Sequence, residues 1–165
     1  MDRAERVFDT VLHALARLAA AVFASIAALI PVDLILRNGF GASIYGLLDA
    51  IEYGLLVATF LAAPWVLSIN AHVSVDVFVG GLSGRARRVA DTLANVAGAC
   101  AAGVFLWFAV VAMTQSIERE TMIRTAFVIP EWWVLAAAPA SMALILVEFA
   151  RRLLRAGGAN VRTGL

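Results

Sequence analysis

Acidic side chains lie at the ends of long apolar runs in this chain, where charge is costly to place. Asp49 and Glu52 enter the second of these runs, and Asp91 and Glu148 lie near the ends of the third and fourth. An ionisable group within a membrane span is usually retained for a purpose. The acids could therefore couple transport to a proton or cation, or they could pair with arginines of neighbouring helices.

The first of these interpretations is an autonomous, ion-coupled exporter built from four helices. Such an exporter needs an acid near the middle of its first helix, and the stretch Leu18–Ile30 contains none. We therefore favour pairing between helices. The expected pairs are Arg17 with Glu148 or Asp91, and Arg37 with Glu52 or Asp49.

The residue types give little support for a haem, a disulfide or a metal site. His13 and His72 both lie near the same side of the expected spans, whereas a bis-histidine haem needs its histidines on facing helices at membrane depth. Cys100 is the only cysteine, which excludes an internal disulfide and a multi-cysteine metal site. We expect no catalytic residue, no cofactor and no metal site in this chain.

The composition indicates whether water or lipid surrounds the chain. Of 165 residues, 62% are hydrophobic and 15% are charged, and the mean hydropathy is +0.89. A soluble domain of this size could not bury so much apolar surface, so lipid must surround much of the chain. The net charge of +1 gives no indication of a nucleic-acid partner.

The apolar runs predict an all-α integral membrane protein, residues 1–165 forming a single four-helix domain. The spans are expected at about 11–36, 47–69, 89–114 and 131–152. Prolines at 31, 64 and 139 are expected to kink their helices locally. Asp33 and Arg37, four residues apart, can pair along the first helix. Ala94, Gly98 and Ala102 form a small-residue face that predicts close contact with another helix.

Arginine placement predicts the orientation. Four spans put ten arginines on the side of the two termini and three on the other side, so both termini are expected in the cytoplasm. After the second span, residues 73–82 form an amphipathic stretch that we interpret as an interfacial helix on the cytoplasmic face. Arg85, Arg87 and Arg88 follow it and are expected to attract anionic lipid headgroups.

Two motifs in this chain resemble a known family. Glu52 is followed by Thr59–Ala63 and then by Asn70–Val77, which contains His72 and Asp76. This pattern resembles the small membrane subunit of tripartite ATP-independent periplasmic (TRAP) transporters. The segment Ile129–Trp132 and the later Pro139 resemble the fourth helix of that family. The family commonly has a basic residue or glycine just before the histidine, where this chain has Asn70 and Ala71, and frequently a basic residue at the position of Ser74.

The resemblance implies a subunit of a sodium-driven uptake system in the bacterial inner membrane. A periplasmic binding protein captures an organic anion such as a dicarboxylate or sugar acid, and a large membrane subunit carries the substrate and sodium sites. The small subunit supports the large one as a scaffold and helps to dock the binding protein. On this interpretation Glu52, His72, Asp76, Pro139 and the arginines at 85, 87 and 88 have structural, partner-binding or lipid-binding roles.

Overall fold

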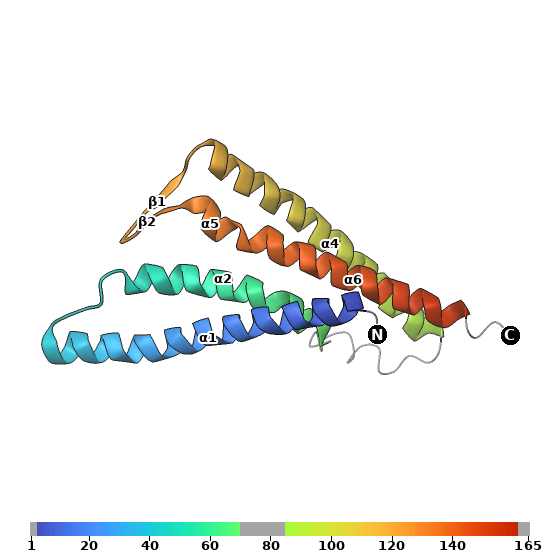
Figure 1. Ribbon diagram of the computed structural model, residues 1–165, viewed down its shortest axis with the longest axis horizontal. Coiled ribbons are helices and arrows are strands. Elements are labelled where there is room, and N and C mark those ends of the chain that lie inside the picture. Colours follow the sequence, from blue (N-terminus) through green and yellow to red (C-terminus); the bar gives the residue numbers. More distant parts are fainter. Residues whose placement is uncertain (1–2, 70–84, 162–165) are drawn as a thin grey trace.

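The computed structural model describes residues 3–69 and 85–161 (Figure 1). In chain order the elements are α1 (Arg3–Phe40), α2 (Leu47–Ser68), α4 (Arg85–Glu118), β1 (Met122–Arg124), β2 (Val128–Pro130), α5 (Glu131–Leu135) and α6 (Ala137–Val161). The expected interfacial helix at 73–82 lies outside the described residues. The start of α1 and the end of α6 lie at the same end of the molecule, which we call the junction end; the end that carries β1 and β2 is the hairpin end (Figure 1).

Four helices are long and apolar enough to cross a membrane, as the sequence predicts. Two of them extend well beyond the predicted spans: α1 covers Arg3–Phe40 where 11–36 is predicted, and α4 covers Arg85–Glu118 where 89–114 is predicted. The second helix, Leu47–Ser68, agrees with the predicted span 47–69 to within one residue. A helix of 38 residues such as α1 is about 57 Å long at 1.5 Å per residue, whereas the hydrocarbon core is about 30 Å thick. Such a helix tilts or continues into the headgroup region, so its ends do not coincide with the ends of the apolar run.

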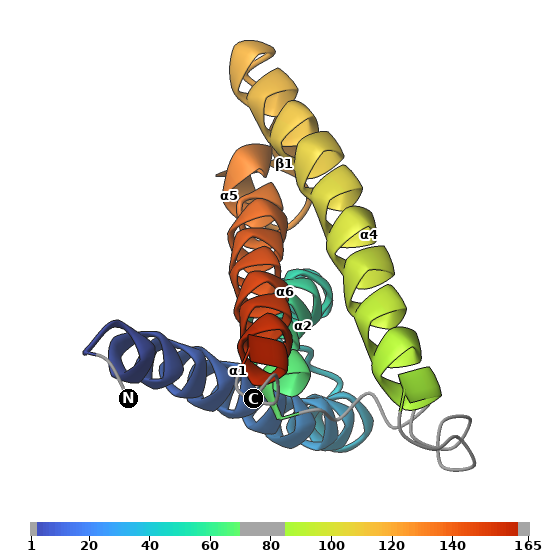
Figure 2. The same ribbon diagram turned by 90° about the vertical axis from the view of Figure 1, so that its right-hand side faces the viewer.

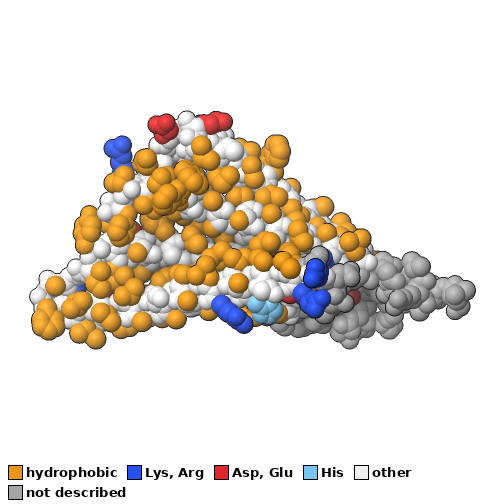
Figure 3. Space-filling model, viewed as in Figure 1, with side chains coloured by type: hydrophobic (Ala, Val, Ile, Leu, Met, Phe, Trp, Pro, Cys, Tyr) orange, Lys and Arg blue, Asp and Glu red, His pale blue; other side chains and the backbone are white. Residues whose placement is uncertain are grey.

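The four long helices pack in an open row. The main packing contacts join α1 to α2, α2 to α6, and α6 to α4. Figure 2 shows α6 in front of α2, with α1 and α4 on different sides of this central pair. Hydrophobic side chains cover most of the face seen in Figure 3. This distribution is expected for a chain whose outer surface faces lipid or a partner subunit.

Small residues bring the paired helices together. Gly54 of α2 lies against Ile26 of α1: a Cβ placed on the glycine would be 3.2 Å from Cδ1 of Ile26. Gly98 of α4 lies against the ring of Phe149 in α6, and a Cβ there would be 2.5 Å from the ring. Ala102 is buried on the same helix, whereas Ala94 is exposed. The predicted contact face is therefore confirmed at Gly98 and Ala102 but not at Ala94.

Prolines affect the helices differently. Pro31 and Pro64 lie within α1 and α2, which each continue as one helix through them. Pro139 has no N–H to donate to the carbonyl of Leu135, and α5 ends at that residue. The fourth span is thereby divided at Ala136 into α5 and α6. The predicted interruption is present, one turn before the proline that causes it.

A short hairpin, which the sequence analysis does not predict, connects α4 to α5. Strands β1 and β2 pair antiparallel, with Met122 opposite Pro130 and Arg124 opposite Val128. Glu120, with a φ of 50°, reverses the chain after α4. The tip of the hairpin reaches the start of α2, and it thereby links the α4–α6 pair to the α1–α2 pair.

Candidate functional site

The junction end holds a cluster of four charged residues from α1 and α6: Asp9, Glu148, Arg151 and Arg152, called here the junction cluster. Nη1 of Arg151 lies 3.0 Å from Oδ1 of Asp9 and 3.2 Å from Oε2 of Glu148. Nε of Arg152 lies 3.4 Å from Oε1 of Glu148. Each carboxylate oxygen of Glu148 thus faces its own guanidinium. Through these ion pairs the cluster connects the first turns of α1 to the part of α6 that lies at the junction end.

Burial explains why Glu148 needs two partners. Only 6% of the residue is exposed, and an isolated carboxylate at such a position would lose its hydration without compensation. The arginines come three and four residues later on the same helix, which places both beside the carboxylate. Arg151 also stacks over the ring of Phe8, with its guanidinium carbon 4.6 Å from the ring centroid.

Arg152 has a second role at the end of α2. Its Nη2 donates a hydrogen bond to the carbonyl oxygen of Leu67. The last carbonyls of a helix have no partner within the helix, so a cationic side chain there adds a donor to the exposed end of the helix. The junction cluster therefore connects α1, α2 and α6.

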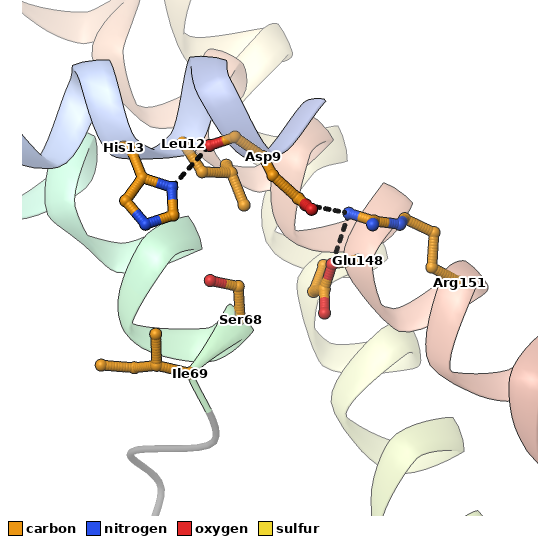
Figure 4. A pocket seen from close by; sticks show the side chains of 7 residues that line it. All are labelled: Asp9, Leu12, His13, Ser68, Ile69, Glu148 and Arg151. Atoms are coloured by element: carbon orange, nitrogen blue, oxygen red, sulfur yellow. Dashed lines mark hydrogen bonds and ion pairs between the residues drawn. The ribbon is translucent and has the colours of Figure 1, made fainter. Parts of the chain in front are cut away.

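A cavity of about 240 Å³ opens beside the cluster, the junction pocket (Figure 4). The residues that line it are Asp9, Leu12, His13, Ser68, Ile69, Glu148 and Arg151. Nδ1 of His13 lies 2.7 Å from the carbonyl oxygen of Asp9. Because a carbonyl only accepts, this nitrogen carries a proton and donates a hydrogen bond to Asp9. The ring of His13 packs edge-on against Trp65 at 6.4 Å between centroids.

The hairpin end holds acids that interact mainly with neutral donors. Oδ1 of Asp33 accepts hydrogen bonds from the backbone N–H of Ile44 at 2.7 Å and from Oγ of Ser43 at 3.2 Å. These two bonds fix the loop between α1 and α2. Arg37 adds an ion pair to Asp33 at 3.5 Å, as predicted, but its side chain is 65% exposed.

The hairpin is fixed to the rest of the fold by two further acids. Oδ2 of Asp49, in the first turn of α2, accepts the backbone N–H of Ala126 at 2.7 Å. Oε2 of Glu131 accepts a hydrogen bond from Oγ of Ser116 at 2.9 Å, which joins the end of α4 to the start of α5. The ring of Phe127 lies against Gly46, so the hairpin tip packs on the residue that precedes α2.

Comparison with known families identifies the class of this chain. A family model described as "Tripartite ATP-independent periplasmic transporters, DctQ component" matches residues 26–157. The chain belongs to this family. No curated protein and no solved structure matched it. The resemblance to a small TRAP subunit, predicted from the helix-two and helix-four motifs, is confirmed.

Membership of this family establishes two general properties of the chain. A DctQ component is part of a transporter and is not an enzyme, in agreement with the prediction from sequence. Together with the four apolar helices, it makes this chain a multi-pass membrane protein. No group of three or more His, Cys, Asp or Glu side chains that could hold a metal ion occurs within 3–69 and 85–161.

The residues singled out in the sequence of this DctQ component lie in different places. Glu52 is exposed on α2, and Pro139 is buried in the first turn of α6. His72 and Asp76 lie outside the described residues. The three arginines belong to the start of α4, where the helix is described but their side chains are not: Arg85, Arg87 and Arg88.

The predicted interhelical pairs are wrong. Glu148 is paired with Arg151 and Arg152, its neighbours along α6, and not with Arg17, which is exposed. Arg37 is paired with Asp33 and not with Asp49 or Glu52. The reason is distance along the chain: partners three or four residues away on one helix reach each other without requiring a particular helix arrangement.

An ion pair between Asp9 of α1 and Arg151 of α6 is absent from the sequence analysis. A signal for it exists. Asp9 lies two residues before the apolar run of α1, and Arg151 immediately follows that of α6. Two opposite charges at the same predicted membrane boundary are candidates for a pair, although sequence alone does not show that these two helix ends meet.

Proposed function

We propose that this DctQ component is the small scaffold subunit of a sodium-driven TRAP transporter that imports an organic anion. It lies in the bacterial inner membrane with both termini in the cytoplasm, so that the junction end is cytoplasmic and the hairpin end periplasmic. The large membrane subunit carries the substrate and sodium ions, and a periplasmic binding protein delivers the substrate. The chain supports the large subunit and contributes to docking at the hairpin end.

The observation that best supports this proposal is the burial and ion pairing of Glu148. Among the described residues it is the one buried ionisable side chain, and both of its oxygens are held by arginines. A coupling acid has to gain and lose a proton or cation during transport, whereas both oxygens of Glu148 already face guanidinium groups that compensate its charge. Glu52, the other candidate, is exposed on the surface of α2. Both acids suit a static subunit better than an autonomous exporter.

The open packing of the helices supports a role beside a larger partner. On α4, Trp107 and Phe108 are 69% and 65% exposed. Paired aromatic side chains of this size supply a large contact area when a partner covers them. The proposal expects the large subunit to cover part of this row of helices and lipid to cover the remainder.

Individual residues receive roles within this proposal. Glu52 contacts a partner or pairs with it near the periplasmic side. His72 and Asp76 help to fix the subunit at the cytoplasmic face, where Arg85, Arg87 and Arg88 attract anionic headgroups. Pro139 divides the fourth span, which lets α5 and α6 follow different directions.

The test is reconstitution with and without this chain. The large subunit and the chain are coexpressed, purified by a tag on the chain, and placed in liposomes with the binding protein and a panel of organic acids. We expect copurification and sodium-dependent uptake that disappears when the chain is omitted. His72→Ala and Asp76→Ala are expected to reduce copurification while leaving the sodium concentration for half-maximal uptake unchanged.

The same preparation separates the proposal from its rival. Liposomes that contain the chain alone are expected to show no ion-driven transport. Efflux from such liposomes that Glu52→Gln abolishes would show an autonomous exporter and contradict the scaffold role. Full uptake by the large subunit in the absence of this chain would contradict it equally.

A further inference from the structure

One side of α1 carries a row of polar residues near the junction end. At about 100° per residue, five positions in the first half of the helix fall within an arc of about 80°. They are called here the α1 basic face: Arg3, Arg6, Thr10, His13 and Arg17. All five side chains are exposed. Figure 3 shows basic side chains on both sides of a histidine along the lower edge of the molecule, where α1 lies.

Arg17 lies where an unpaired charge is costly. It comes six residues after Val11, at which the apolar run of α1 begins, and this corresponds to about 9 Å along the helix axis. Glu148, one of the acids expected to pair with it, is held by Arg151 and Arg152 instead. Arg17 forms no ion pair with any other residue that the structure describes. Its charge therefore requires an anion that these residues do not supply.

The geometry of the helix directs this side chain toward the membrane surface. Side chains of an α-helix lean toward its N-terminus, which in α1 lies at the junction end (Figure 1). The long stem of Arg17 can therefore stay in apolar surroundings while its guanidinium approaches the boundary at Val11. Arg3 and Arg6 precede that boundary on the same side of the helix. An anion at the boundary thus has arginines on both sides of it along the helix.

The α1 basic face contains no acidic residue. Glu5 and Asp9, the two acids between positions 3 and 17, fall outside the arc. Nη1 of Arg151 lies 3.0 Å from Oδ1 of Asp9, so Asp9 is directed toward α6. A row of arginines without a carboxylate among them attracts anions and repels cations.

We propose that the α1 basic face binds the phosphate of an anionic phospholipid. A planar guanidinium matches two phosphate oxygens with two parallel N–H bonds, and the phosphates of a leaflet lie at the boundary that Arg17 approaches. A zwitterionic phospholipid carries the same phosphate together with a cation, which the arginines repel. The face therefore favours a lipid whose headgroup has a net negative charge.

The position of the face favours lipid over an acidic segment of a protein. Trp107 and Phe108, the exposed aromatic side chains that suit a protein partner, lie on α4. Figure 2 shows α1 and α4 on different sides of the central pair formed by α2 and α6. A partner that covers α4 leaves the α1 basic face to the surrounding leaflet. In this one respect the inference rests on the proposed function, which places the large subunit beside this row of helices.

The test measures which lipids the protein retains. The chain is purified in mild detergent with any partner that stays bound, delipidated, and incubated with phosphatidylglycerol or phosphatidylcholine of identical acyl chains. Native mass spectrometry then counts the retained lipids. We expect phosphatidylglycerol to be retained at least about tenfold more strongly, because each arginine near anionic headgroups contributes a factor of about five.

Matched variants assign the effect to the α1 basic face. Arg17→Gln and Arg119→Gln each remove one exposed positive charge, but Arg119 follows α4 at the hairpin end. We expect Arg17→Gln to lower the retention of phosphatidylglycerol about fivefold and Arg119→Gln to leave it unchanged. Arg17→Lys keeps the charge and is expected to keep most of the retention. To exclude headgroups attracted to the start of α4, each comparison is repeated in a chain that carries Arg85→Gln, Arg87→Gln and Arg88→Gln.

Each outcome supports or overturns the proposal. Loss of retained phosphatidylglycerol in Arg17→Gln but not in Arg119→Gln supports it. Equal retention of the two lipids by the unaltered chain, or equal effects of the two glutamine substitutions, overturns it. If Arg17→Gln lowers copurification with the large subunit and leaves lipid retention unchanged, Arg17 pairs with a protein acid and the proposal is wrong. The scaffold function is tested by sodium-dependent uptake, so the failure of either proposal is distinguishable from that of the other.

Discussion

The two ends of the molecule hold their acids in different ways. At the junction end, Asp9 and Glu148 face arginines, and charge compensates charge. At the hairpin end, Asp33, Asp49 and Glu131 accept hydrogen bonds from backbone N–H groups and hydroxyls. Both arrangements satisfy carboxylates, but only the first requires a matching cation to be present.

The two arrangements respond differently when one of their residues is removed. A buried ion pair contributes little net stability, yet removal of one partner is severe because the other charge remains buried and uncompensated. A carboxylate that accepts backbone N–H groups orders a loop, and its removal releases only that loop. We therefore expect damage at the junction end to destabilise the whole helix row and damage at the hairpin end to remain local.

The largest effect is expected for Glu148→Gln. The change leaves Arg151 and Arg152 beside a neutral side chain, and we expect the free energy of unfolding to fall by about 3 kcal/mol. The measurement is unfolding of the purified protein in mild detergent by added denaturing detergent. Glu52→Gln, at an exposed position on α2, is the control and should change the value by less than about 0.5 kcal/mol. Equal losses in the two variants would refute a special role for the junction cluster.

At the hairpin end the largest effect is expected for Gly46→Ala. Gly46 has a φ of 74°, and a Cβ there would lie 2.7 Å from the ring of Phe127. Gly41 has a φ of 64° but has open space around it. Gly41→Ala therefore isolates the backbone cost of about 1 kcal/mol, and Gly46→Ala adds crowding for a total of about 2 kcal/mol.

The double variant Gly46→Ala, Phe127→Ala distinguishes these causes. Removing the ring relieves the crowding, so the two substitutions should couple favourably in a double-mutant cycle. Additive losses would mean that the hairpin tip does not pack on Gly46 as the structure has it.

A smaller effect is expected for Asp49→Asn. It weakens the bond to the N–H of Ala126 and removes an acid from the first turn of α2, at a cost of about 1 kcal/mol. Amide hydrogen exchange should accelerate at Ala126 and in the hairpin while α6 keeps its protection. Asp91→Asn, at an exposed position on α4, should leave the hairpin amides unchanged. A uniform acceleration across all helices would contradict a local role.

The features of the fold also differ in whether they can be predicted from the sequence. The four spans are predictable because a span is recognised from the hydropathy of about twenty consecutive residues, which does not depend on how neighbouring helices pack. That Gly98 lies on a face in contact with another helix follows from the spacing of small residues, and the ion pair of Asp33 with Arg37 follows from the spacing of charges on one helix. Both predictions use only the spacing of residues along a single helix.

Features that join distant parts of the chain could not be predicted in this way. The pair of Asp9 with Arg151 and the bond from Ala126 to Asp49 span 142 and 77 residues. The three-residue strands of the hairpin are too short for an alternation pattern, and residues 115–125 are simply polar. Which helix ends meet depends on packing among all four helices, which no single segment encodes.

The smallest effect is expected for Arg37→Met, and it tests the difference between the two ends most directly. Arg37 and Arg151 both pair with an acid, but the Arg37 side chain is 65% exposed and that of Arg151 is 17% exposed. An exposed pair contributes at most a few tenths of a kcal/mol, about 0.3 kcal/mol here, because water screens it. Asp33 keeps its bonds to Ser43 and Ile44 in the variant, so the loop stays ordered. If Arg37→Met instead costs as much as Arg151→Met under the same detergent titration, the hairpin end also depends on paired charge, and the contrast between the ends is wrong.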